Sequence, residues 1–360
     1  MTQICKIINQ CWARNSYLTA LTVFSLFILV VSLLGFAIDH KLVMGEQAWV
    51  KPVKFSASLA LYGMTLYWLS QYLTNYEYAF RKICRAALVG SVIELTVIVT
   101  QVLRGAPNHF NMGTSFDNGM AWLTAAAIMP VAYATVAIFF MLLRERNLPT
   151  VLGCALKWGT FLSIVGCVPG LMMLAPAAMQ GVVAHVQHVA MQGHAAMQGT
   201  AAMQGSATMQ GSATMQGTAT MQGVAAHSQH AVMQTTGLSQ TSTGLPFLGW
   251  STVAGDLRVA HFVGIHALQF LPIVAFIVMK ALSKFSQVRQ ELLISNIGIT
   301  YGAVIVLLTR QALLAEPLTA PSHHTLAYAV LLTLLSLNIA MYILFAPSPA
   351  VPKQWQKAES

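Results

Sequence analysis

Eight long apolar stretches constrain the fold of this chain more than any other feature. The first, residues 17–38, runs for 22 residues without a charged side chain. The other seven are about 54–73, 84–104, 119–143, 151–174, 259–281, 292–314 and 325–346. At about 1.5 Å per residue, a helix of this length crosses roughly 30 Å of hydrocarbon. The pattern predicts an all-α, polytopic membrane helix bundle with about eight transmembrane helices.

The composition agrees with a lipid environment. Only 8% of the 360 residues are charged, against about 25% in soluble domains. The net charge of +9 would suit nucleic acid, but the basic residues form short clusters between the apolar stretches. Such clusters are typical of topology signals. We therefore expect a lipid bilayer as partner and no nucleic acid.

The positions of lysine and arginine predict an orientation. With the N-terminus inside, 13 of the 19 basic residues fall on the cytoplasmic side, which is the usual bias. This predicts cytoplasmic ends at 1–16 and 347–360, and five spans within 17–174. Three further spans follow within 255–346, and the loop 175–254 between the two sets lies on the extracytoplasmic side.

Two matching offsets suggest an internal repeat. Lys54-Phe55 and His261-Phe262 are separated by 207 positions, and Arg104 and Arg310 by 206. A four-plus-four parallel duplication would produce both offsets. The alternative is a chance match between helices of similar length.

The outer loop is a low-complexity segment with a six-residue register from Met179 to Met233, in which MQG units recur. Thioether and imidazole groups suit Cu(I) or Ag(I), and an expansion that binds nothing is the alternative. Composition favours the second interpretation, so neither these metals nor haem is favoured as cofactor. The candidate ligands are His185, His188, Met191, His194, His227 and His230.

Polar residues on three stretches form the candidate site. Glu94, Gln101 and Arg104 share one helical face, with Glu94 about 15 Å inward of Arg104, near the bilayer midplane. A carboxylate there is costly and points to function. Arg258, His266 and Gln269 also share a face, and the last two lie near the depth of Glu94.

These positions predict a polar funnel open to the outside, with Glu94, His266 and Gln269 at its base. Its cationic rim would attract an anionic or carboxylate-bearing ligand. Alternatively, Glu94 and His266 relay protons, and the single basic residues serve as interfacial anchors. The predicted rim consists of Lys51, Lys54, Arg104, His109, Asn111, Asp256, Arg258, His261 and Arg310.

Three segments carry a resemblance: WVKPVKFSAS (49–58), QVLRGAPNHFN (101–111) and GDLRVAHFVGIHALQ (255–269). They resemble signatures of a family of bacterial multi-spanning membrane proteins whose activity is uncharacterised. The resemblance implies a bacterial cytoplasmic (inner) membrane setting. It implies nothing about chemistry and does not cover the repeat loop.

The preferred function is a transporter or channel for a small solute or ion, and a homo-oligomer is compatible with it. A membrane-embedded enzyme or haem or metal-binding protein is the first alternative, although no catalytic motif is present. The second is a sensor or assembly factor that binds a metal or partner through the outer loop.

Overall fold

The computed structural model describes residues 12–43, 45–107, 114–174 and 244–347. Nearly all regular structure in them is helical. The helices are α2 (Ser16–Ile38), α3 (Val50–Leu69), α4 (Glu77–Arg104), α5 (Ser115–Arg144), α6 (Thr150–Leu174), α9 (Leu257–Ile265), α10 (Ala267–Ala281), α11 (Gln287–Leu313) and α12 (His323–Phe345). Strands β1 (Leu42–Val43) and β2 (Glu46–Gln47) pair as a short antiparallel hairpin before α3.

The described helices are those of a multi-pass membrane protein. Six of them, α2, α4, α5, α6, α11 and α12, are long and apolar enough to cross a membrane, and the bent pair α9–α10 adds a seventh if it forms one span. The eight predicted stretches all fall on helical structure, with 54–73 covered by α3 and the one-turn 3-10 helix Ser70–Tyr72. The all-α prediction is confirmed to this extent.

The predicted span 259–281 differs from expectation because it is broken. α9 and α10 meet at His266 and are bent by 51°. A break frees backbone groups that lipid cannot satisfy. Here neighbouring helices supply the partners: Ser163 of α6 donates to Ile265 O (3.0 Å) and accepts from Leu268 N (3.1 Å), and Tyr301 of α11 donates to Val263 O (2.6 Å).

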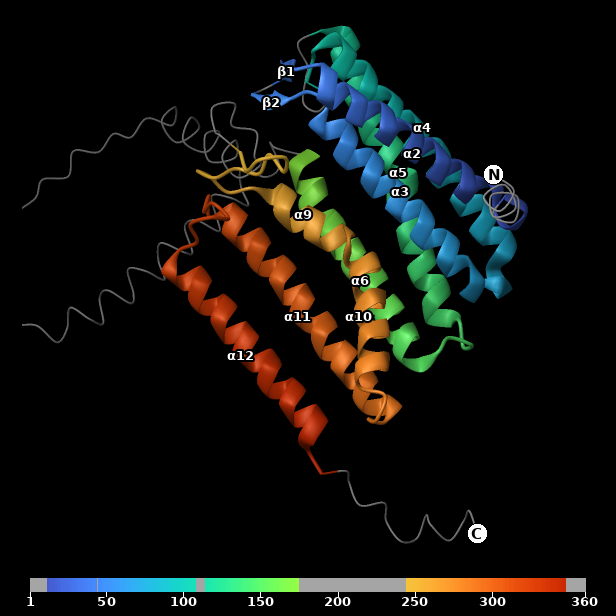
Figure 1. Cartoon of the computed structure of the whole chain (residues 1–360), viewed down its shortest axis with the longest axis vertical. Helices are drawn as coiled ribbons and strands as arrows, with labels where there is room; N and C mark the ends of the chain where they lie inside the picture. Colours follow the sequence, from blue (N-terminus) through green and yellow to red (C-terminus); the bar gives the residue numbers. More distant parts are fainter. Residues whose placement is uncertain (1–11, 44, 108–113, 175–243, 348–360) are drawn as a thin grey trace, which may run out of the picture.

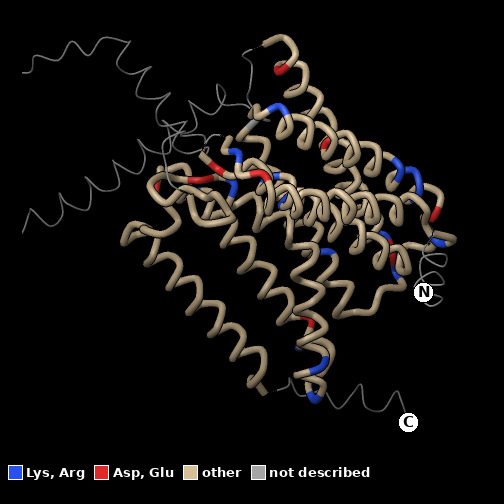
Figure 2. Tube along the Cα trace, turned by 45° about the horizontal axis from the view of Figure 1, so that its top comes forward, with Lys and Arg blue, Asp and Glu red and all other residues tan. Residues whose placement is uncertain are grey.

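The helices form two groups, as Figure 1 shows from the blue-to-green and the green-to-red parts of the chain. In the first group α2 packs on α3 and α4, α3 touches α4, and α4 packs on α5. In the second, α6 packs on α9, α10 and α11, and α11 packs on α12. Contact between α5 and α6 joins the two groups. Charged residues gather mainly toward the helix ends (Figure 2).

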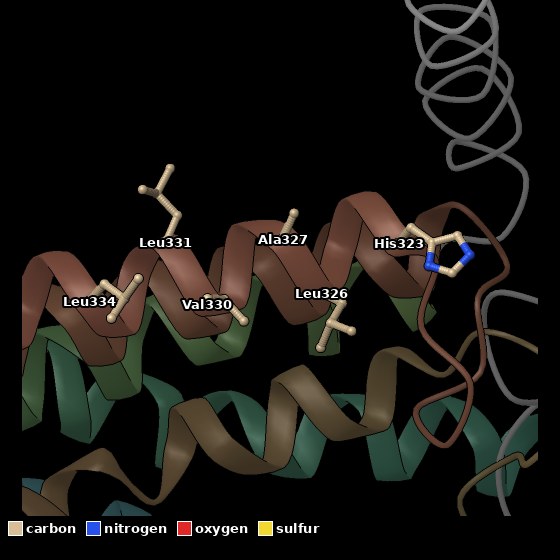
Figure 3. A pocket seen from close by; sticks show the side chains of 6 residues that line it. All are labelled: His323, Leu326, Ala327, Val330, Leu331 and Leu334. Carbon is tan, nitrogen blue, oxygen red and sulfur yellow. The ribbon is translucent and has the colours of Figure 1, made fainter.

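Helix α12 lies at the edge of the bundle, and Thr325 is its one buried residue. Polar contacts at three levels hold it to α11. Arg289 donates to Leu344 O and Ala346 O (both 2.5 Å), Asn296 and Thr300 donate to Ser336 (3.1 Å to O and 2.9 Å to Oγ), and Arg310 donates to Thr325 Oγ1 (3.3 Å). A shallow apolar groove runs along the helix, and Leu331 and Leu326 project to opposite sides of it (Figure 3). Its lining residues are His323, Leu326, Ala327, Val330, Leu331 and Leu334.

Two glycines bring the backbones of α6 and α9 into contact next to the break. A Cβ on Gly166 would lie 2.6 Å from Ile265 N, and one on Gly264 would lie 3.1 Å from Gly166 N. Both distances are shorter than ordinary van der Waals contact. Small residues at such crossings let membrane helices approach closely, which brings Ser163 within reach of α10.

We predict that Gly166→Ala lowers the thermal stability of the purified protein, because the new methyl group would overlap the α9 backbone. Overpacking of this kind costs about 1–3 kcal/mol. Thermal unfolding in detergent measures the effect. Gly119→Ala is the matched control, because a Cβ there meets nothing within 4 Å. Equal stability of Gly166→Ala and wild type would contradict the close approach.

Candidate functional site

Three basic side chains meet where α3 and α9 begin; we call Lys51, Lys54 and Arg258 the basic triad. Lys51 and Lys54 lie in the first turns of α3, and Arg258 in the first turn of α9. The charges of the three act on one another. The start of α3 lies near the ends of two neighbouring helices, where Trp49 packs beside Val102 of α4 and over Gly35 of α2.

Arg258 is the most strongly held member of the triad. Its Nε donates to both carboxylate oxygens of Asp256 (2.9 and 3.1 Å), and its Nη2 donates to Asp256 Oδ2 at 2.6 Å. Nη2 also donates to Gly249 O at 2.7 Å. The buried Asp256 in turn caps α9 by accepting from Arg258 N at 2.9 Å. Charge-assisted bonds of this geometry fix a guanidinium firmly.

The hairpin before α3 adds a carboxylate that sequence reasoning missed. Glu46 Oε1 lies 3.9 Å from Arg258 Nη1, and the two side chains remain 38% and 34% exposed. The Glu46 carboxylate packs directly on Gly249, whose φ of 64° and lack of a Cβ make room for it. Lys54 Nζ donates to Leu248 O at 2.9 Å. These contacts join the segment before α3 to the segment before α9. We call the region formed by the basic triad, Glu46 and Asp256 the mouth.

Glu94 lies on α4 below this mouth, and only 2% of it is exposed. Its Oε2 atom is buried and has no hydrogen-bond partner among the described residues. The only charge found to act on Glu94 in the described part is that of Lys51. No direct ion pair within 4.0 Å joins these two described side chains. Lys51 Nζ instead lies 5.8 Å from the centre of the Phe55 ring.

Polar side chains also surround the helix break. His266 Nε2 lies 3.3 Å from Ser58 Oγ, two turns below Lys51 on α3. Gln269, on the first turn of α10, is 9% exposed, and its Oε1 is buried without a partner in the described structure. His261 hydrogen-bonds Gly166 O through Nδ1 at 2.8 Å. Thus Ser58, His266 and Gln269 continue the polar line that begins at the triad.

The other predicted rim residues lie in separate clusters. Arg104 Nη1 donates to Asp117 Oδ1 at 2.7 Å, Gln101 Nε2 donates to the same oxygen at 3.3 Å, and the Arg104 guanidinium lies 4.4 Å from the Phe116 ring centre. Arg310 lies over the Tyr328 ring at 5.3 Å. These contacts join consecutive helices, so the predicted rim residues form several local groups instead of one ring.

Some predicted positions fall outside the described residues. They are His109 and Asn111 of the rim, and the proposed metal ligands His185, His188, Met191, His194, His227 and His230. In the described ranges, no group of three or more His, Cys, Asp and Glu side chains is placed to hold a metal ion.

Comparison with protein-family models, with curated proteins and with solved structures found no match in any of the three.

We predict a pH-dependent contribution from Asp39, which lies outside the membrane helices and anchors the segment leading to the site. The Trp49 indole N–H donates to its Oδ2 at 2.9 Å, and Lys41 N donates to Oδ1 at 3.1 Å. These bonds, that of Trp49 first, lower the pKa of Asp39 below its usual value. A lowered folded-state pKa gives stability that is present above the unfolded value of about 3.9.

This stability is lost as pH falls through the folded-state pKa. Asp39→Asn should therefore melt below wild type at pH 7, and the gap should close below about pH 4. Thermal unfolding between pH 7 and 3 measures it. A gap that is unchanged at low pH would show that the mutation acts through packing and not through the charge.

Proposed function

We propose that the protein moves a small solute or ion across a bacterial cytoplasmic membrane, with Glu94 as a proton-carrying group. The observation that carries this proposal is the buried Glu94 oxygen without a hydrogen-bond donor. An ionisable side chain in a membrane helix is costly unless it is protonated, hydrated or bound to a ligand. A carboxylate whose only charged influence is one lysine is suited to gain and lose a proton.

The broken helix supports the same proposal. Discontinuous helices in membrane transporters place polar groups at mid-membrane depth, next to the substrate or coupling ion. Here the break at His266 lies beside Ser58 and Gln269. The backbone carbonyls freed by the break accept hydrogen bonds from α6 and α11. Contacts with these two helices therefore hold the end of α9 in place, where hydrogen bonds to α10 are missing.

A four-plus-four repeat of eight spans, with α3 and α9–α10 as equivalent spans, is part of the proposal. The pairings α2–α3, α2–α4, α3–α4 and α4–α5 have counterparts in α6–α9, α6–α11, α9–α11 and α11–α12. Helices α4 and α11 also end in the same turn.

In that turn Gln101 Nε2 donates to Pro107 O (3.4 Å) and Gln311 Nε2 donates to Pro317 O (2.9 Å), 210 positions later. Gly105 and Ala315 both adopt positive φ, 69° and 59°. Because these two helices end in the same turn, we favour an internal duplication over a chance match between helices of similar length.

The orientation proposed is that predicted from the basic residues, with both termini cytoplasmic and the triad on the outer side. The hairpin, the triad and the ends of α4 and α11 then face outward. Glu94 lies between this mouth and the inner half of the bundle.

Proton-coupled flux in proteoliposomes tests the function. Vesicles loaded with a pH-sensitive dye would receive gradients of Na⁺, K⁺, Cl⁻, phosphate or succinate, with and without an imposed potential. We expect wild type to change internal pH faster than empty liposomes for at least one of these. Glu94→Gln should slow this change about tenfold or more, because it removes the titrating group.

Glu77→Gln is the matched control, because Glu77 makes only an exposed ion pair with Arg81 (3.7 Å) at the start of α4. Its flux should equal that of wild type. Unchanged flux in a folded Glu94→Gln protein, or wild-type flux equal to that of empty liposomes in every gradient, would contradict the proposal.

A further inference from the structure

The basic triad and Glu46 form an arrangement that transport alone does not require. Three cations act on the Glu46 carboxylate, but only Arg258 approaches it within 4.0 Å. Asp256 is occupied by its bonds to Arg258. Counted against the two acids that form ion pairs with it, Glu46 and Asp256, the triad retains one positive charge in excess. Removing Glu46 would leave two.

The Glu46 contact is weak compared with the other bonds of the mouth. A distance of 3.9 Å and exposed fractions above one third describe an exposed ion pair, and such pairs contribute about 0–1 kcal/mol. Glu46 belongs to a hairpin with only two residues in each strand. Displacing this side chain would therefore cost little, whereas the bonds between Arg258 and Asp256 would continue to hold the guanidinium in place.

We propose that the basic triad is a binding site for the carboxylate of a small organic anion, and that Glu46 occupies it as a built-in substitute when the site is empty. A ligand carboxylate would displace Glu46 from Arg258 and accept hydrogen bonds from the triad. Carboxylates suit a guanidinium and neighbouring ammonium groups that already hold an acidic side chain. The hairpin then acts as a lid that competes with the ligand.

The inference rests on the proposed function in one respect, since it names the solute class. An anion bound at Lys51 would lie near Glu94, and proton uptake by Glu94 would remove the repulsion between two carboxylates. Anion and proton would then move together. The binding itself can be measured without transport.

Calorimetric titration of the purified full-length protein with succinate, at constant ionic strength, tests the inference. We expect Glu46→Gln to bind succinate about three- to tenfold more tightly than wild type, because the competing carboxylate is gone. Glu77→Gln removes the same charge far from the triad and should leave the affinity unchanged. Equal affinity of wild type and Glu46→Gln, or no detectable binding by Glu46→Gln, would overturn the inference.

A second variant checks the triad. Lys54→Gln in the Glu46→Gln background should weaken succinate binding about tenfold, since it removes one of three cations. Lys54 is chosen because Arg258 holds the buried Asp256 and its loss could prevent folding. Thermal unfolding of each variant confirms that it is folded. Unchanged affinity in the double variant would remove Lys54 from the site.

Phosphate and chloride distinguish a carboxylate site from a general anion site. In Glu46→Gln we expect both to bind more weakly than succinate, and equal affinity for phosphate would overturn the assignment to carboxylates. Succinate binding without proton flux in any of the tested gradients would refute the transport proposal alone. Flux without a Glu46 effect on binding would refute this inference alone.

Discussion

In hydrocarbon every polar group must find its partner within the protein, and the arrangement of these helices follows from that requirement. Where α9 breaks, Ser163 and Tyr301 from other helices bond the freed carbonyls. Where Arg258 enters the bundle, Asp256 and Gly249 O receive its donors. Glu94 is the exception among the ionisable groups of the described interior, because its Oε2 has no donor. Gln269 Oε1 and Ser91 Oγ are also buried without a partner in the described structure, but neither group ionises.

The sequence predicted the helical class and the positions of the apolar stretches well, because lipid-crossing segments need length and apolar composition above all. It also singled out Glu94 and Gln269, both of which are buried in the described structure. It did not predict the break at His266 although Gly264 and Pro272 lie near it, because prolines also lie within the continuous helices α5 and α6 and the bonds that stabilise the break come from Ser163, about a hundred residues earlier. Helical periodicity carries no information about such distant partners.

The sequence also did not predict which acidic side chains pair with which arginines. Glu46 lies in the two-residue strand β2 and Asp117 in the first turn of α5, just before the predicted span 119–143, yet each meets an arginine. The sequence predicts Arg104 in the rim because it lies at the same depth as the other basic residues, but its guanidinium donates to Asp117 of the next helix. The signal that could have suggested Asp117 is its place three residues after Thr114, whose side chain caps α5 by accepting from Asp117 N. The turn shared by Gln101 and Gln311 has an offset of 210 positions, four more than that of Arg104 and Arg310, so it matches the helix ends in a register that the sequence offsets did not predict.

The attachment of α12 has a consequence for assembly. Its polar contacts with α11 lie at three levels along almost the whole helix, and each uses a polar group that lipid cannot replace. A slide of α12 by one turn, about 5.4 Å, would break the polar contacts at all three levels. The apolar surface of α12 would be buried in lipid equally well in any register. Helix α12, which follows α11 in the chain, would therefore enter the bilayer on its hydrophobicity alone and reach its final depth afterwards, when its polar groups pair with those of α11.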